Sequence, residues 1–203
     1  MIARKSLSFV RLAPLAAMLL IGGPLAASPA LAFGTAPSSK PPKVSTPASP
    51  EDSAAMAAKT RATAEALYKK AWEDSEAGKA DLKKNKPKDA NKKFAKALKR
   101  YDEATKLDPT YFEAWNMVGF CSRKTGDLKR SFAAYDKALQ LKPDYDEAHE
   151  YLGEAYLMSG DIAKAKEQLA WLKEKQSPEA GELEEAIEAA GKGQPADQAG
   201  KGW

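Results

Sequence analysis

Apolar and small side chains recur with helical spacing along the second half of the chain. Between Trp115 and Ser122 they fall at i, i+3, i+4 and i+7, which places them on one face of a helix. Between Ser131 and Ala138 a second stripe has the same character. A small residue in each stripe, such as Gly119, would let two helix backbones approach closely. The pattern predicts two helices that pack together as a hairpin.

Turn-forming residues mark the ends of these two helices. Gly126 suits the left-handed conformation that ends a helix, and Asp127 is placed to cap the free amides of the next one. Pro143 ends the second helix, because the residue before a proline is driven out of the helical region. The predicted hairpin therefore occupies residues 112–143.

The whole pattern returns with a shift of 34 residues. The run YDEATKLDPTY, from Tyr101 to Tyr111, recurs as YDKALQLKPDY from Tyr135 to Tyr145. Outside this run, the matched positions are Ala114, Gly119, Gly126 and Asp127 with Ala148, Gly153, Gly160 and Asp161. A fixed period of this size indicates stacked copies of one supersecondary unit rather than a single globular core.

A longer and less regular unit precedes the two clean copies. Its second helix carries an apolar stripe that begins at Phe94 and is closed by Pro109. Its first helix is best placed over about 51–84, with the turn at Asn85-Lys86-Pro87. The repeat register therefore requires an insertion of about four helical turns' worth of residues, which lengthens both helices.

The end of the array is marked by a helix-start signal at Ser177-Pro178-Glu179, in which the serine caps and the proline takes the first position. The helix that follows has the character of the solubilising cap that terminal repeats need. The TPR-like region therefore spans 51–190, with hairpins at about 51–109, 112–143 and 146–176 and a cap at 178–190.

The spacing and the residue types resemble the tetratricopeptide repeat (TPR), a helix–turn–helix unit of this length. The resemblance covers 67–172, and its most specific segments are YLGEAY at 151–156 and GDIAKA at 160–165. It implies an all-α, TPR-like α-solenoid of about three helical hairpins plus a C-terminal capping helix, a fold that usually binds proteins. The pattern is also similar to that of small exported TPR proteins of proteobacteria.

In TPR arrays the first helices of successive hairpins line a concave groove, and the resemblance implies which residues lie there. Phe120 and Tyr151 would be its aromatic anchors, unless they pack against neighbouring repeats instead. Glu147 and Glu150 would repel a carboxylate, so a basic or mixed-charge, partly apolar segment of a protein partner fits best. The implied groove residues are Glu113, Asn116, Met117, Phe120, Arg123, Lys124, Glu147, Glu150, Tyr151, Glu154 and Leu157.

The first 32 residues have the pattern of an export signal. Basic residues up to Arg11 precede an apolar run over 12–21, and the small-x-small site Ala30-Leu31-Ala32 follows. Residues 33–50 are expected to form a flexible linker rich in Pro, Ser and Ala, and residues 191–203 a disordered tail. The expected location is the periplasm of a Gram-negative bacterium. An uncleaved inner-membrane anchor, with the repeats on the same outer side, is the alternative.

Charge is distributed unevenly along the chain. Without the three basic residues of the signal, the net charge falls from +4 to +1, yet ten basic residues face two acidic ones over 79–100. Over 144–188, thirteen acidic residues accompany four basic ones. Both segments are explained as solvated helix surface or as interaction surfaces.

The second of these explanations gives the alternative function, a cell-envelope structural factor whose basic hairpin 79–100 associates with an anionic membrane surface. Homo-oligomerisation, head to tail, is a further option. Nucleic acid is not expected as a partner, because few aromatic residues are interleaved among the lysines of an exported chain. The anionic-surface contacts would be Lys83, Lys84, Lys86, Lys88, Lys92, Lys93 and Lys96.

The sequence contains no recognisable set of catalytic residues. His149 is the single histidine and falls on a packing position, and no paired cysteine is available for a zinc site. Neither a Gly-rich phosphate loop nor a serine-nucleophile elbow occurs. The single cysteine, Cys121, is expected to be a buried thiol. The prediction is a non-catalytic scaffold or adaptor without cofactor or metal.

Overall fold

The structure of the protein is a computed structural model, and it describes residues 49–193. The expected signal peptide, the linker up to residue 48 and the tail from residue 194 lie outside the described residues. In the part that is described, no helix is long and apolar enough to cross a membrane. The helices are α1 (Pro50–Lys83), α2 (Pro87–Leu107), α3 (Phe112–Lys124), α4 (Leu128–Leu141), α5 (Asp146–Ser159), α6 (Ile162–Glu174) and α7 (Ala180–Gly191).

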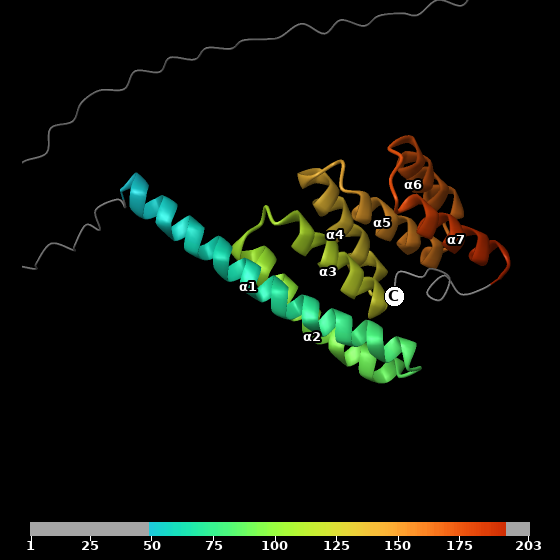
Figure 1. The fold of residues 1–203 in the computed structure, drawn as a ribbon, viewed down its shortest axis with the longest axis horizontal. Helices are drawn as coiled ribbons and strands as arrows, with labels where there is room; N and C mark the ends of the chain where they lie inside the picture. Colours follow the sequence, from blue (N-terminus) through green and yellow to red (C-terminus); the bar gives the residue numbers. More distant parts are fainter. Residues whose placement is uncertain (1–48, 194–203) are drawn as a thin grey trace, which may run out of the picture. The chain divides into compact units, whose positions relative to one another are not determined.

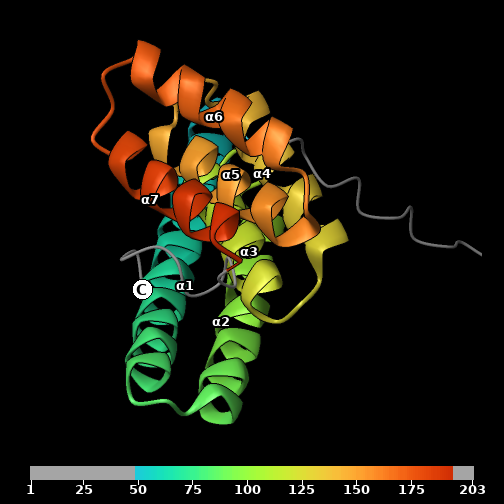
Figure 2. The same ribbon diagram turned by 90° about the vertical axis from the view of Figure 1, so that its right-hand side faces the viewer.

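The helices pack in sequential pairs (Figures 1 and 2). α1 packs with α2, α3 with α4 and α5 with α6, while α7 contacts both helices of the last pair. Neighbouring pairs meet through α2 against α3 and α4 against α5. This arrangement confirms the predicted all-α array of hairpins, in which each unit completes its core against the next one.

The first hairpin is longer than the others. α1 has 34 residues and α2 has 21, whereas each later helix has 14 or fewer. The turn between them places Asn85 in the left-handed region, at φ 55°, and Pro87 begins α2. The predicted lengthening of both helices is therefore confirmed. The N-terminal part of α1 is exposed over residues 50–59 and projects beyond α2 (Figure 1).

Close helix approach in the first two hairpins depends on a glycine that faces a large side chain. Gly119 lies against the ring of Tyr135, and Gly78 lies against the ring of Phe94. A Cβ atom on Gly78 would lie 2.7 Å from Phe94 Cε1, closer than real Cβ contacts allow. Gly78 is therefore an interior packing residue of the long hairpin, not a loop residue.

In the last hairpin, the side chain that packs against the glycine comes from outside the hairpin. Gly153 is the counterpart of Gly119, but the side chain that it faces is Leu183 of α7. Leu183 is fully buried, together with Leu172 of α6 and Ala186 of α7. The capping helix is therefore part of the core of the last unit as well as its cover.

The predicted helix ends are largely confirmed. Asp127 and Asp161 accept hydrogen bonds from the third amide beyond them, at 3.0 and 3.1 Å. Gly126 and Gly160 have the expected positive φ values, 90° and 83°. α7 begins at Ala180, two residues later than predicted from the sequence.

A local turn explains this later start. The Ser177 hydroxyl accepts a hydrogen bond from the Glu179 amide at 3.2 Å, so it closes a turn over 177–179 instead of capping a helix that begins at Pro178.

Cys121 lies in the core, as predicted. Its side chain is fully buried, and its Sγ atom lies 3.6 Å from the hydroxyl oxygen of Ser75 in α1. Burial raises the pKa of the thiol to about 12, because the thiolate would be poorly solvated there. The thiol therefore acts as a small apolar packing group.

We expect Gly78→Ala to lower the free energy of unfolding by about 1–3 kcal/mol, because the added methyl group would push against a ring that is itself buried. Urea denaturation measures this change. Gly181→Ala in α7 is the matched control, since no atom lies within 4 Å of its added Cβ; it should be neutral or stabilising by up to about 1 kcal/mol. Equal effects of the two substitutions would refute the packing role of Gly78.

Candidate functional site

The predicted groove residues lie on α3 and α5, but most of them are buried. Phe120 is fully buried between Phe94 of α2 and Tyr151 of α5, with ring centroids 5.7 and 5.3 Å apart. Tyr151 is half-buried and also packs near Tyr135. Of the two alternatives left open by the sequence, packing between hairpins therefore applies to Phe120, whereas Tyr151 packs between hairpins but keeps some access to solvent.

A buried ion pair connects α3 to α5 across the same face. The guanidinium of Arg123 pairs with the carboxylate of Glu154, and both side chains are buried. Burial is the largest single influence and acts to lower the pKa of Arg123, but Glu154, Tyr135 and Glu150 together outweigh it, and the net shift is upward. Arg123 and Glu154 therefore neutralise each other inside the array, whereas the sequence placed both in an open groove.

The start of the C-terminal helix lies against one acidic residue of the predicted groove. Glu150 is only 2% exposed, because Glu179 and Glu182 at the start of α7 lie against it. Burial, and then repulsion from Glu154, raises the pKa of Glu150 well above the usual carboxyl value. The cap was predicted, but its position over this part of α5 was not.

Other predicted groove residues are also buried, including Leu157, Asn116 and Met117. Leu157 packs in the cluster that joins α5, α6 and α7. The members that keep access to solvent are Glu113, Lys124, Glu147 and Tyr151.

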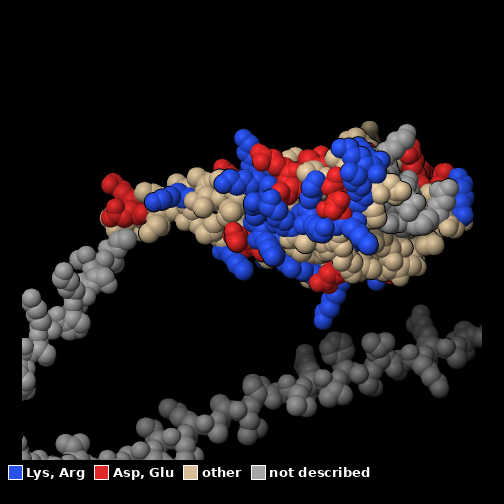
Figure 3. Space-filling model, turned by 90° about the horizontal axis from the view of Figure 1, so that it is seen from below, with Lys and Arg blue, Asp and Glu red and all other residues tan. Residues whose placement is uncertain are grey.

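The seven lysines predicted to contact an anionic surface divide into two groups. Three of them pair with acidic groups of the same hairpin: Lys92 with Asp89, Lys93 with Asp81 and Lys96 with Asp74, at 3.3, 2.7 and 3.0 Å. The hairpin carries a broad patch of Lys and Arg side chains with acidic groups among them (Figure 3). These pairs reduce the net charge that the middle of the hairpin offers to an anionic surface.

The second group surrounds the turn between α1 and α2. Its members are exposed and form no ion pair with any residue between 49 and 193. They are Lys83, Lys84, Lys86 and Lys88.

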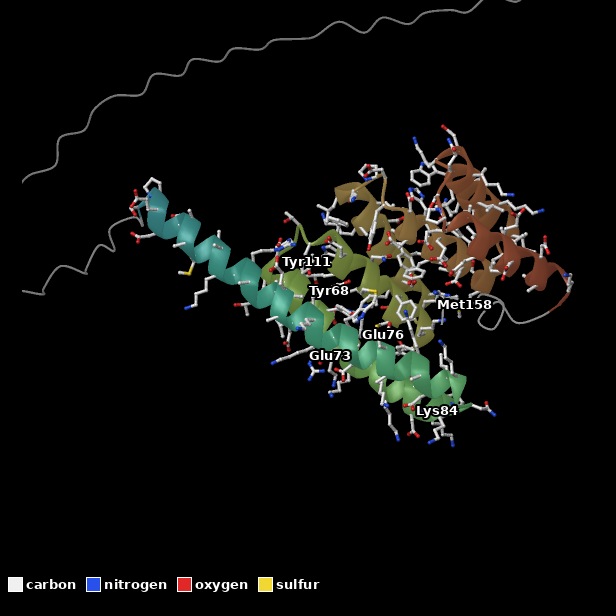
Figure 4. All side chains as sticks on the ribbon, viewed as in Figure 1. Tyr68, Glu73, Glu76, Lys84, Tyr111 and Met158 are labelled. Atoms are coloured by element: carbon white, nitrogen blue, oxygen red, sulfur yellow. The ribbon has the colours of Figure 1, made fainter. Side chains whose placement is uncertain are left out.

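A cavity of about 620 Å³ opens beside this turn, and we call it the tip pocket. Leu82, Ala90 and Phe94 give it an apolar surface. Figure 4 labels Met158 of α5 above Lys84, which follows the last residue of α1. The remaining lining residues are Lys83, Asn85, Pro87, Asn91, Arg123, Lys124 and Met158.

The tip pocket brings together residues that the sequence assigned to two separate surfaces. Arg123 and Lys124 belong to the predicted groove, and Lys83 belongs to the predicted anionic-surface contacts. Leu82 and Met158 were not predicted as site residues, because the fold alone brings the end of α1 close to the end of α5. The helical stripes of the two hairpins carry no signal for that proximity.

His149 has the packing role that its repeat position indicates. Its ring stacks on Trp171 with 3.6 Å between centroids. His149 Nε2 lies 3.0 Å from the carbonyl oxygen of Pro143. In the preceding repeat, 34 residues earlier, Trp115 Nε1 donates a hydrogen bond to the carbonyl oxygen of Pro109, also at 3.0 Å. The two side chains therefore make equivalent contacts in successive repeats.

Comparison with known families supports the repeat architecture. Residues 123–160 match the family model described as TPR repeat. This segment is a TPR repeat. It begins at the end of α3 and includes α4 and α5, so it joins the second helix of one hairpin to the first helix of the next. No curated protein matches the chain.

TPR domains are generally protein-binding modules and are usually non-catalytic. The described side chains agree with a binding role in one respect: the open tip pocket combines apolar surface with charged groups, as binding pockets commonly do.

We expect Arg123→Met to lower the free energy of unfolding by about 3–5 kcal/mol, because it leaves a buried carboxylate without its partner. The double variant with Glu154→Met should recover most of this loss. Chemical denaturation of the single and double variants measures the coupling.

The control is Lys173→Met, which breaks the exposed pair between Lys173 and Glu184 and should change stability by less than about 1 kcal/mol. An Arg123→Met effect as small as this one would show that the buried pair does not hold α3 to α5.

Proposed function

We propose that this protein is a non-catalytic scaffold or adaptor that binds an acidic, partly apolar segment of a partner protein in the tip pocket. The observation that carries the proposal is the composition of that pocket, with Leu82 and Phe94 beside Lys83 and Arg123. Its volume of about 620 Å³ is within the range that admits side chains of a bound segment. An apolar side chain of the partner would contact Leu82 and Phe94, and a carboxylate of the partner would reach Lys83.

Arg123 and Lys83 have different parts in this choice of ligand. The guanidinium of Arg123 is buried and paired with Glu154, so it forms part of the pocket wall. Lys83 lines the same pocket and is exposed, so its ammonium group is the cation that a ligand carboxylate would reach.

The proposal differs from the ligand that the sequence favoured. A basic or mixed-charge segment was expected because Glu147 and Glu150 were placed in an open groove. Glu150 lies beneath the start of α7, and Glu154 is paired with Arg123. Glu147 stays exposed but does not line the tip pocket. The tip pocket carries the cationic residues Lys83 and Lys124, so electrostatic complementarity favours an acidic partner.

A second candidate function has one specific observation in its favour. The turn lysines Lys83, Lys84, Lys86 and Lys88 are exposed and lack ion pairs with described residues, so they are suited to phosphate groups of an anionic membrane surface. For location we propose the periplasm, which rests on the export-signal pattern of residues 1–32.

Photo-crosslinking tests the proposed pocket. We expect a crosslinker at Asn91, which lines the pocket, to capture a protein in cells, and the same group at the exposed Gln140 on α4 not to capture it. The captured segment, prepared as a peptide, should bind at least about tenfold more weakly to the double variant Lys83→Glu with Met158→Asp. The peptide's own acidic residues should be required.

Lys70→Glu is the matched control for Lys83→Glu, because it makes the same charge change as that single substitution at an exposed position of the same helix and should leave binding unchanged. Equal capture from Asn91 and Gln140, or a peptide that binds without its acidic residues, would refute the pocket proposal. Salt-sensitive sedimentation with vesicles of anionic phospholipid, lost in Lys84→Glu with Lys88→Glu, would favour the membrane function instead.

A further inference from the structure

The start of α1 is a helical segment that the rest of the array leaves open. Residues 50–59 are all exposed, and they project beyond the end of α2 (Figure 1). A helix of this length is marginal in water by itself, because most helical stability in proteins comes from the packing of one face against a neighbour. The segment is therefore suited to pack against a further surface.

Two exposed apolar side chains lie together beside this segment. A concave corner of about 840 Å³ is formed by the start of α1 and the end of α2, and we call it the amino-terminal corner. Met56 lines it and is 68% exposed, more than any other large hydrophobic side chain among residues 49–193. Leu107 also lines it and is 39% exposed. Exposed apolar side chains that share one concave surface are typical of an interaction site.

The residues that α1 contributes to the corner occupy one face of the helix. They are at positions 52, 53, 56, 57, 60 and 61, two neighbouring rows with a spacing of four residues. Asp52 and Lys59 lie along the same edge of this face, because seven residues make almost two whole turns. Neither side chain forms an ion pair with any residue between 49 and 193. Asp52 caps the helix through Oδ2, so Oδ1 can accept from a partner.

We propose that two copies of this chain form a symmetric dimer, in which the starts of their α1 helices pack antiparallel through this face. A two-fold axis near Met56 would bring the two Met56 side chains into contact. The same edge of each helix then meets, so Asp52 of each copy lies opposite Lys59 of the other, and two equivalent ion pairs form. A parallel pair would instead place like charges side by side, which opposes association.

The end of α2 completes the surface that receives the second copy. In the antiparallel pair, Pro50 of one copy lies opposite Arg61 of the other, on the side of α1 where Leu107 lies. Contact between Pro50 and Leu107 would cover the second exposed apolar side chain. Arg61 is already held by Glu65 and Asp108, so this wall of the corner is formed before the second copy arrives.

The interface is small, and its size sets the expected affinity. Each copy contributes roughly ten residues, against about 20–30 a side in a standard stable interface. We therefore expect a reversible dimer with a dissociation constant on the order of 10⁻⁵ M. The corner lies at the start of α1 and the tip pocket at its end, so dimerisation is independent of the function proposed for that pocket.

Sedimentation equilibrium of the full chain measures the association. We expect mostly monomers at about 1 µM and mostly dimers at about 100 µM. Met56→Glu should raise the dissociation constant at least about tenfold, because it places two carboxylates beside the symmetry axis. Ile162→Glu is the matched control, since it makes the same kind of change at an exposed apolar residue of α6 and should leave the constant unchanged.

Charge reversal tests the antiparallel pairing. Asp52→Lys and Lys59→Glu should each weaken self-association at least about tenfold, because each places like charges together in both ion pairs. An equimolar mixture of the two variants should associate about as tightly as the unmodified chain, since both pairs are again of opposite charge in the mixed dimer. Lys69→Glu, at an exposed position of α1 outside the corner, is the control for Lys59→Glu and should have no effect.

Three results would overturn the proposal. The first is a monomer at about 100 µM, as expected if residues 33–48 of the same chain or a different protein occupied the corner. The second is an equal effect of Met56→Glu and Ile162→Glu on the dissociation constant. The third is a mixture of the two charge-reversal variants that associates no better than each variant alone.

Discussion

The close approach of paired helices at a glycine is the constraint on which the rest of this structure depends. Gly78, Gly119 and Gly153 each leave room for a large side chain that crosses from another helix. Two helices of a hairpin cannot bury their apolar stripes without such an approach, and a hairpin alone leaves its outer stripe exposed. Stacking of successive hairpins removes both problems, so the array is stable as a whole rather than repeat by repeat.

This constraint also explains the special role of α7. In the middle hairpin the glycine faces Tyr135, which comes from the second helix of the same unit. In the last hairpin the corresponding glycine faces Leu183, which comes from beyond the repeats. The terminal unit therefore depends on a segment that does not repeat, and anything that strengthens the docking of α7 also stabilises the end of the array.

One face of α5 makes three different kinds of contact. Glu150, Glu154 and Met158 follow one another at i, i+4 and i+8 and so share that face of the helix. Glu150 lies against the start of α7, Glu154 neutralises Arg123 of α3, and Met158 lines the tip pocket. The buried ion pair therefore lies between the contact with α7 and the tip pocket.

The sequence by itself determined the repeat, the helices and most of their ends. These features follow from local rules: apolar spacing at 3.6 residues per turn, glycine in the left-handed conformation and aspartate at the cap. It also placed Cys121 correctly in the core, because a position beside a regular apolar stripe is buried in any packing of that hairpin.

Only the tertiary structure decided which of the predicted groove residues remain accessible to solvent. Phe120 and Tyr151 have the sequence spacing of groove residues, but their exposure depends on how closely α2, α3 and α5 approach. Glu150 of α5 likewise meets Glu179 and Glu182 only where the start of α7 packs on α5, a contact that no local pattern predicts. The tip pocket likewise joins the ends of helices more than 70 residues apart in the chain, since Leu82 and Met158 both line it. Proximity of this kind is set by the stacking of whole hairpins, which no local pattern in the sequence encodes.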